Sequence, residues 1–223
     1  MNGKLFLVAT PIGNMEDITL RALRLLAEAD IIFAEDTRHT AHLLAHHKIR
    51  KPLQSYHAFN EARRTSEITE RIAQGQKVAL VSDAGSPGIS DPGFRVARAC
   101  VEMGLPIEVI PGPCAAIAAL SASGLPSDEF HFVGFLPSKT GACEKRLRAL
   151  VSLPGTLIIY ESPYRLVRTL GQIAAIFPDH QIVAARELTK KFEEFRRGKA
   201  AEILAHFQAH RPKGEFVILI GKP

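Results

Sequence analysis

Hydrophobic positions in the first half of the chain alternate between short continuous runs and stretches with helical spacing. The continuous runs predict strands at 4–9, 31–34, 53–56, 78–82 and 107–110. The amphipathic stretches between them predict helices near 18–29, 40–47, 61–73 and 94–103. Because helices of this length separate the strands, we expect βαβ units and a mostly parallel sheet.

The second half has a different pattern. After Pro111-Gly112-Pro113, a small-residue helix is predicted at 114–122. Further strands are predicted at 130–135, 156–160, 181–186, 192–197 and 216–220, with helices at 142–150, 163–177 and 200–210. The strands at 181–186 and 192–197 form an antiparallel hairpin in this interpretation, so the sheet is mixed. We therefore predict two different α/β domains, 1–112 and 113–223, with a cleft between them.

Composition and hydropathy indicate a folded, water-soluble chain. Of 223 residues, 46% are hydrophobic and 23% are charged. The mean hydropathy is +0.04, and the sequence lacks the run of roughly 18 uncharged apolar residues that a membrane span needs. The apolar run at 5–9 is too short for the core of a signal peptide. We expect a cytoplasmic protein that does not bind membranes.

Cysteines and histidines give no sign of a disulfide framework or a metal site. The three cysteines are far apart and lack CxxC spacing. Three histidines, His39, His42 and His46, have helical spacing, but no carboxylate or cysteine completes a plausible ligand set. A histidine-rich helix surface is the preferred interpretation, and no metal is expected.

Positive charge is concentrated in the second half. Residues 1–112 contain 13 Lys and Arg against 13 Asp and Glu, whereas residues 113–223 contain 15 against 10. Concentrated positive charge suits a polyanionic partner such as nucleic acid. Solvated faces of helices and strands explain the same charges equally well.

Turns rich in glycine and proline follow several predicted strands, at 10–14, 82–93, 111–115 and 161–163. Loops at the carboxyl ends of parallel strands line the ligand crevice, and small residues let backbone groups approach a ligand closely. Asp91-Pro92 and Ser162-Pro163 could instead start helices as an N-cap followed by proline. The dense turn at 82–93 favours a ligand-binding role. Neither a G-x-G-x-x-G nor a phosphate-loop motif is present.

Blocks of sequence in these turns, and around them, resemble the ribosomal RNA small subunit methyltransferase I family of the tetrapyrrole methylase superfamily. They cover nearly the whole chain and read VATPIGN, DITLRAL, AEDTR, LVSDAG, SASGLP, YESP, ARELTK and PKGEF. The resemblance implies S-adenosylmethionine-dependent 2′-O-methylation of a cytidine ribose in the decoding region of 16S ribosomal RNA. It also implies a two-domain α/β fold with a folded cofactor in the interdomain cleft, and a homodimer. The helical C-terminal extension usual in the family is absent from this sequence.

The resemblance also assigns cofactor contacts. They fall on Pro11, Ala84, Gly85, Ser86, Ile89, Cys114, Ala115, Glu161 and Leu188. Relatives in the superfamily carry an aspartate where this chain has Ser86, and the adjacent Asp83 could supply a carboxylate instead.

Catalytic and RNA-binding candidates come from the chemistry of a ribose hydroxyl, which is a poor nucleophile helped by a general base. The catalytic candidates are Asp83, Glu161 and Lys190, with Glu35 and Asp36 as further carboxylates. The candidates for RNA phosphate contacts are Arg38, Arg186, Lys190 and Lys213.

Structural alternatives remain open for these residues. Asp36 could cap the second helix. Glu161 could only position the cofactor, Lys190 and Lys213 could be solvated, and Cys114 could be a small core residue. For the whole chain, the alternatives are a tetrapyrrole C-methyltransferase and a noncatalytic RNA-binding protein.

Overall fold

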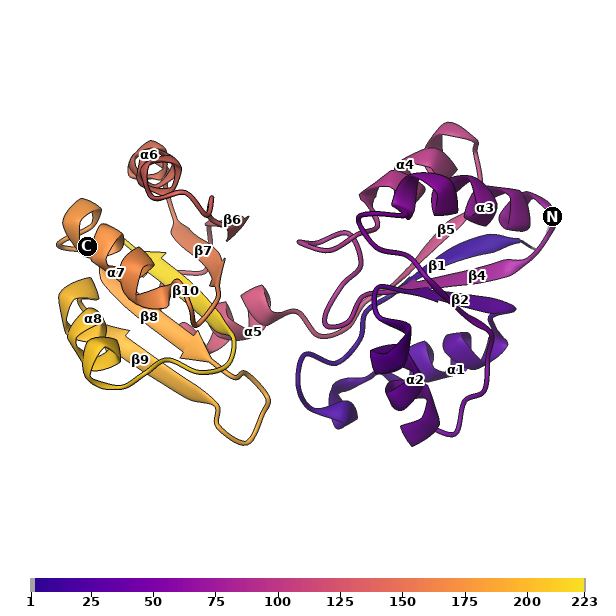
Figure 1. The fold of residues 1–223 in the computed structure, drawn as a ribbon, viewed down its shortest axis with the longest axis horizontal. Coiled ribbons are helices and arrows are strands. Elements are labelled where there is room, and N and C mark those ends of the chain that lie inside the picture. The colour runs from indigo at the N-terminus through magenta and orange to yellow at the C-terminus, as the bar shows by residue number, and fades with distance from the viewer. Residues whose placement is uncertain (1–2, 223) are drawn as a thin grey trace. The chain divides into compact units, whose positions relative to one another are not determined.

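The computed structural model describes residues 3–222, and the chain divides into two compact units, Met1–Cys114 and Ala115–Pro223 (Figure 1). The division falls two residues beyond the one expected from the sequence. Each unit contains its own five-stranded sheet.

The first unit is built on a parallel sheet with strand order β3-β2-β4-β1-β5. Its strands are β1 (Lys4–Val8), β2 (Ile31–Ala34), β3 (Leu53–Ser55), β4 (Lys77–Val81) and β5 (Ile107–Ile110). Because every strand runs in the same direction, the turns after β1, β2, β4 and β5 lie at one edge of the sheet. The parallel sheet expected from the sequence is confirmed.

Helices cover both faces of this sheet (Figure 1). They are α1 (Leu20–Glu28), α2 (Thr37–His46), α3 (Glu61–Ala73) and α4 (Phe94–Glu102), and a short 3-10 helix, η1 (Met15–Asp17), precedes α1. Alternate strand residues pack in opposite directions: Phe6 and Val8 contact the α1 and α2 side, whereas Leu5 contacts the α3 and α4 side. The sheet is therefore buried on both faces, as its nearly continuous apolar strands require.

The second unit has a mixed sheet with strand order β6-β7-β10-β8-β9. Its strands are β6 (Phe130–Phe135), β7 (Thr156–Glu161), β8 (Gln181–Arg186), β9 (Glu194–Gly198) and β10 (Phe216–Gly221). Among these strands of the described chain, β6 and β7 alone pair in parallel, and the predicted hairpin is the antiparallel pair of β8 and β9.

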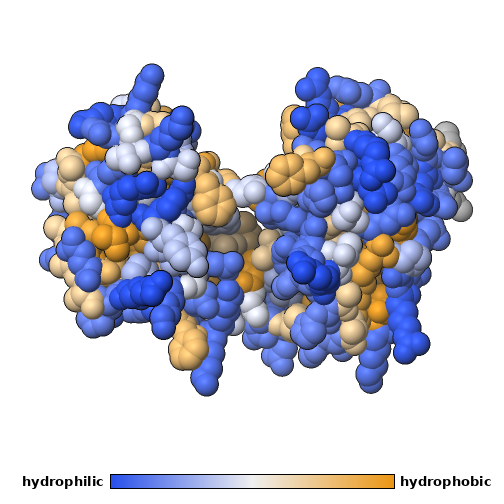
Figure 2. Space-filling view, viewed as in Figure 1, coloured by the Kyte–Doolittle hydropathy of each residue, from blue (hydrophilic) through white to orange (hydrophobic). Residues whose placement is uncertain are grey.

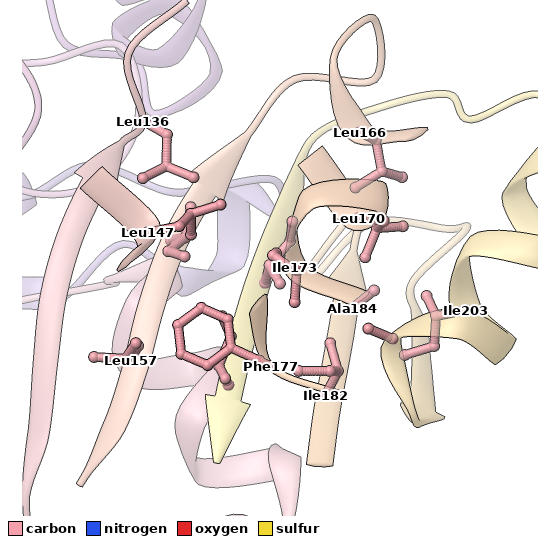
Figure 3. Close-up of a cluster of buried hydrophobic side chains, with 14 of the residues drawn as sticks. Leu136, Leu147, Leu157, Leu166, Leu170, Ile173, Phe177, Ile182, Ala184 and Ile203 are labelled. Carbon is pink, nitrogen blue, oxygen red and sulfur yellow. The ribbon is translucent and has the colours of Figure 1, made fainter. Parts of the chain in front are cut away.

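One hydrophobic cluster joins this sheet to three helices (Figure 3). The helices are α6 (Thr140–Leu150), α7 (Leu166–Ile176) and α8 (Ala200–Ala209), whereas α5 (Ala115–Ser123) contacts β7, β8 and β10. Leu147, Ile173 and Phe177 are at most 1% exposed, and they point toward the sheet residues Leu157 and Ile182. This packing fixes β7 and β8 against the helices.

α4 begins at Phe94, where the helix at 94–103 was predicted, but the alternative in which Asp91 and Pro92 start the helix is wrong. Asp91 and Pro92 do not cap it, because the helix begins at Phe94 and its N-cap is Gly93, with φ 151°. A Cβ atom at Gly93 would lie 2.7 Å from the backbone nitrogen of Gly88. The loop folds back on itself at this point, which leaves the Asp91 side chain available for other contacts.

The start of α7 differs from the prediction. We expected a helix from Pro163, but α7 begins at Leu166. The backbone N–H groups of Arg165 and Leu166 both donate to the Ser162 carbonyl at 3.1 Å, so a turn precedes the helix.

The surface is mainly hydrophilic on the face shown in Figure 2, with hydrophobic residues in separate patches. Within residues 3–222, no helix is both long enough and apolar enough to cross a bilayer. Some large hydrophobic side chains are nevertheless open to solvent, among them Phe59 and Phe94 in the first unit, which are 99% and 67% exposed.

Candidate active site

Two turns at the carboxyl edge of the parallel sheet are joined by backbone hydrogen bonds. The N–H of Thr10 donates to the Gly85 carbonyl at 2.9 Å, and the N–H of Gly85 donates back to the Thr10 carbonyl at 3.0 Å. The buried Thr10 hydroxyl also donates to the Ser82 carbonyl at 3.0 Å. The turns after β1 and β4 are therefore held together, with Gly85 in the left-handed region at φ 81°.

The turn after β5 lies against the same two turns. A Cβ atom at Gly85 would lie 3.7 Å from both the Ile12 side chain and the Pro113 carbonyl oxygen. At Gly112, a Cβ atom would lie 3.0 Å from the Ala9 side chain. Glycines thus allow the three turns to approach closely, and we call the region that they form, residues 9–14, 82–86 and 111–114, the turn cradle. A site of this composition suits a ligand that is held through contacts with backbone groups.

The expected cofactor residues of the first unit lie on the turn cradle or on the loop that continues from it. Pro11 and Gly85 are buried, whereas Ala84 and Ile89 are exposed. The Ile89 N–H donates to the Ser86 carbonyl at 3.2 Å, so this loop makes a further turn. Cys114 is half-buried at the end of the third turn.

Carboxylates gather beside the cradle, after β2 and β4. Asp83 accepts a hydrogen bond from the backbone N–H of Asp36 at 2.9 Å, which ties the two turns together. Burial and the nearby charge of Asp83 raise the pKa of Glu35. Burial and the charge of Glu35 raise the pKa of Asp91 to about 7, although a hydrogen bond with Ser82 opposes the shift.

Asp36 caps α2, which was the structural alternative for this residue. Its side chain accepts from the backbone N–H of Arg38 at 2.8 Å. Asp36 also forms an ion pair at 2.6 Å with Arg38, whose side chain is 90% exposed, and these hydrogen bonds lower the pKa of Asp36 well below its usual range. Arg38 is thus held at the rim of the same edge while remaining open to solvent.

Glu161 ends β7 in the second unit, and its side chain is completely buried. Its carboxylate accepts hydrogen bonds from the Ser162 N–H at 2.8 Å, Arg165 Nε at 2.7 Å and the Thr169 hydroxyl at 2.7 Å. Arg165 in turn donates to the Leu136 carbonyl at 3.1 Å. These contacts connect β7, α7 and the chain after β6, so Glu161 has a structural role whatever else it does.

The remaining candidates of the second unit lie around the β8–β9 turn. Lys190 Nζ contacts Glu187 at 3.1 Å and Glu215 at 2.7 Å, and Arg186 contacts Glu194 at 3.1 Å. Leu188 is buried between two residues with positive φ angles, Glu187 at 50° and Thr189 at 63°. Ion pairs therefore fix the strained turn that carries Leu188.

Two candidates have simpler surroundings. Lys213 is exposed beside Gly214, where the backbone is left-handed at φ 84°. Ala115 begins α5, and the backbone N–H of the next residue, Ala116, donates to the Tyr160 hydroxyl at 3.1 Å.

The sequence did not single out Ser82, Asp91 or Tyr160 as site residues. Ser82 and Asp91 lie inside the turn at 82–93. That turn contains two acidic residues, Asp83 and Asp91, and this pair was the sequence feature that could have pointed to Asp91. The hydrogen bond between Ala116 and Tyr160 joins residues 44 positions apart, so no local sequence pattern could have indicated it. Among residues 3–222, no set of three or more histidine, cysteine, aspartate or glutamate side chains is arranged to hold a metal ion.

Solved structures share this fold. Uroporphyrin-III-C-methyltransferase from Thermus thermophilus matches all of this chain and 93% of its own, with a TM-score of 0.67 and 24% identity. Diphthine synthase matches 98% of this chain and 90% of its own, with a TM-score of 0.73 and 14% identity. The fold class is that of the tetrapyrrole methylases, with two α/β domains, as predicted.

Sequence comparisons give the family. Residues 4–204 match the family described as Tetrapyrrole (Corrin/Porphyrin) Methylases. A ribosomal RNA small subunit methyltransferase I from Thermotoga maritima is 46% identical over 99% of both chains. One of the same name from Escherichia coli O157:H7 is 46% identical over 98% of this chain and 77% of its own.

The chain belongs to the ribosomal RNA small subunit methyltransferase I family within the tetrapyrrole methylases. The expected enzyme class, an S-adenosylmethionine-dependent methyltransferase, is confirmed by this membership.

Proposed function

We propose that the protein methylates the 2′-hydroxyl of a cytidine in the decoding region of 16S ribosomal RNA, with S-adenosylmethionine as methyl donor. The observation that carries the proposal is the 46% identity, over 99% of both chains, to a ribosomal RNA small subunit methyltransferase I. The turn cradle supports it, because the residues that the family resemblance assigns to the cofactor in the first unit lie on the cradle or on the loop that continues from it.

Several residues would hold the cofactor. In the first unit they are Pro11, Ala84, Gly85, Ser86, Ile89 and Cys114, and in the second unit Ala115, Glu161 and Leu188. S-adenosylmethionine supplies an activated methyl group on a sulfonium sulfur. Because the methyl group is already activated, the protein contributes mainly by alignment of donor and acceptor atoms. A cradle of hydrogen-bonded backbone suits that task, since it has few rotatable groups.

RNA contacts are best sought among cations that remain open to solvent. Arg38 and Lys213 are exposed, whereas Arg186 and Lys190 already contact carboxylates within their own unit. We propose Arg38 and Lys213 as phosphate contacts. Arg186 and Lys190 support the turn that carries Leu188 and contribute to RNA binding through it.

A tetrapyrrole substrate is the second candidate, because uroporphyrin-III-C-methyltransferase shares the fold. That likeness, at 24% identity, extends to the fold alone, whereas the ribosomal RNA methyltransferases are 44–48% identical to this chain. The RNA substrate is therefore preferred. The expected homodimer, the cytoplasmic location and the absence of a metal requirement stay predictions.

Methyl transfer to ribosomal subunits tests the function directly. Purified protein and S-adenosylmethionine with a tritiated methyl group are incubated with small subunits that lack the endogenous modification, and nucleosides are then analysed. Label in 2′-O-methylcytidine supports the proposal. Label on a tetrapyrrole but not on RNA would replace it with the second candidate, and cofactor binding without any transfer would favour a noncatalytic role.

Salt dependence tests the RNA contact at Lys213. Lys213→Ala is expected to weaken RNA binding and to reduce the slope of log K against log salt by about 0.7–0.9, the value for one lost phosphate contact. Lys213→Arg keeps the charge and is the matched control, with a slope close to that of the parent. An unchanged slope for Lys213→Ala would show that this side chain does not contact a phosphate.

A further inference from the structure

A hollow of about 400 Å³ lies in the first unit, lined in part by the loop that continues from the turn cradle. Its lining comes from the turn after β2, the start of α3, and the loop before α4: Glu35, Ala58, Glu61, Ser90, Asp91, Pro92, Gly93, Phe94 and Arg95. This volume falls within the range of small-molecule sites. Phe94 is 67% exposed at the hollow, and an exposed aromatic ring is a platform on which a flipped-out RNA base can stack.

Asp91 connects this hollow to the cradle. Its carboxyl group shares a hydrogen bond with the Ser82 side chain. The Ser82 hydroxyl also lies 3.2 Å from the Gly85 carbonyl oxygen, to which it donates. One hydroxyl group therefore separates the Asp91 carboxyl from the backbone that we assign to the cofactor.

The charges around Asp91 favour a proton acceptor that works near neutral pH. Burial, Glu35 and Asp83 raise the pKa of Asp91 to about 7, and Ser82 opposes them. The other charged side chains that line the hollow, Glu61 and Arg95, pair with each other at 2.7 Å.

The pKa of Glu35 is also raised, by burial and by the charge of Asp83, although the charge of His57 opposes this shift. A base is most effective when its pKa lies near the working pH, because it is then both available and strong enough.

We propose that Asp91 is the catalytic residue that accepts the proton of the ribose 2′-hydroxyl during methyl transfer. This inference rests on the proposed function. The proton moves to a carboxylate oxygen of Asp91 as the 2′-oxygen forms its bond to the methyl carbon. The electron pair of the broken carbon–sulfur bond stays on sulfur, which becomes a neutral thioether, and the proton then leaves Asp91 for water.

Ser82 adjusts the basicity of Asp91 in this scheme. Its hydroxyl has one hydrogen and two acceptors, the Gly85 carbonyl and the Asp91 carboxylate. When Asp91 is ionised, the hydrogen stabilises its charge. When Asp91 is protonated, it donates to the Ser82 oxygen, and Ser82 donates to the Gly85 carbonyl.

The other nearby carboxylates are less suitable as the base. Asp83 accepts from the Asp36 N–H at 2.9 Å and so fixes the turn after β2. Glu35 lines the hollow, and its charge raises the pKa of Asp91, so we assign it that supporting role.

The test is a pH profile of kcat/KM for methyl transfer to small ribosomal subunits. The parent rate should rise with pH to a plateau, with a midpoint near 7, because only ionised Asp91 accepts a proton. Asp91→Asn should lose about 10²–10⁴-fold at the plateau and should lose that midpoint. Cofactor affinity, measured by calorimetry, should stay within a few-fold of the parent, which also shows that the variant folds.

Two further variants should move the midpoint in opposite directions. Glu35→Gln removes a charge that raises the pKa of Asp91, so the midpoint should fall; Ser82→Ala removes the bond that lowers this pKa, so the midpoint should rise. Glu102→Gln, in the exposed Arg98–Glu102 pair of α4, is the matched control and should leave the profile unchanged. Carboxyl ¹³C NMR titration of Asp91 in the cofactor-free protein should show the same order of pKa values.

The outcomes separate the two proposals. A parent that transfers no methyl group to the subunits would overturn the proposed function and this inference together. An active parent with an Asp91→Asn variant of similar rate and pH midpoint would overturn the inference alone. The inference would also be overturned if Glu35→Gln and Ser82→Ala shifted the pKa of Asp91 measured by NMR but left the midpoint of the kcat/KM profile unchanged.

Discussion

Replacing Glu161 with glutamine should destabilise the second unit without removing the chemistry of methyl transfer. The Glu161 carboxylate is completely buried and accepts from Ser162, Arg165 and Thr169 at 2.7–2.8 Å. A glutamine side chain has the same shape but offers one acceptor oxygen and one donor group. At least one of the three partners must then face a donor instead of an acceptor.

The expected cost follows from these contacts. A hydrogen bond to a charged group contributes about 1.5–3 kcal/mol, and removing one partner of a buried ion pair costs about 3–5 kcal/mol. Because glutamine keeps part of the network, we expect Glu161→Gln to lower the free energy of unfolding by about 2–4 kcal/mol. Thr169→Ala breaks a single bond and should cost about 1.5–3 kcal/mol, whereas Thr169→Ser keeps the hydroxyl and should cost less than Thr169→Ala.

Urea unfolding followed by far-ultraviolet circular dichroism measures the change, since the chain contains no tryptophan for fluorescence. Hydrogen exchange should localise the loss of protection to β7 and α7. Methyl transfer is assayed below the unfolding transition and expressed per folded molecule, and Glu161→Gln should keep kcat within a few-fold of the parent.

The opposite pattern would refute this reasoning. If Glu161→Gln kept the parent's free energy of unfolding within about 0.5 kcal/mol and lost 100-fold or more in kcat, the carboxylate would act in the chemistry, as the sequence first suggested.

Two other predictions concern the backbone and the thiols. Gly214→Ala should lower the free energy of unfolding in urea by about 1–3 kcal/mol more than Gly104→Ala does. Both glycines have positive φ angles, but of the two only Gly214 would place a Cβ atom against a neighbour, the Glu187 carboxyl group. Equal costs would show that the turn relaxes freely. Cys100 is fully buried with its pKa raised to about 11, so iodoacetamide at pH 8 should alkylate the half-buried Cys114 well before it, as peptide mass mapping would show. Simultaneous alkylation would mean that the first unit opens readily around α4.

The element pattern was predictable because the apolar positions are strongly periodic. The predicted strands 31–34, 107–110, 130–135 and 181–186 have the bounds found for β2, β5, β6 and β8. Helix caps were less predictable where a loop packs against itself. Gly93, and not Asp91, precedes α4 because only a glycine fits against Gly88, and that contact has no sequence pattern.

The turns of the candidate site were also visible in the sequence, but the roles of individual side chains were not. Asp83 and Asp91 lie in one turn, and nothing local distinguishes the one that fixes Asp36 from the one that meets Ser82. The sequence also did not show which groups the Glu161 carboxylate contacts. Thr169 lies eight residues further along the chain, and its hydroxyl meets Glu161 only because α7 packs against β7.

The backbone bridge between Thr10 and Gly85 has a consequence for how the enzyme matures. Its two residues are 75 positions apart, and they come together only when β1 and β4 pair in the finished parallel sheet. Such distant pairings form late in folding. If the turn cradle holds the cofactor, as proposed, a nascent chain whose β4 is still inside the ribosome has no binding site for it. Once the sheet is complete, cofactor at 100 times its Kd adds about 2.7 kcal/mol of stability. In that case the methyl donor does not bind the protein early in folding, but it stabilises the first unit once that unit has folded.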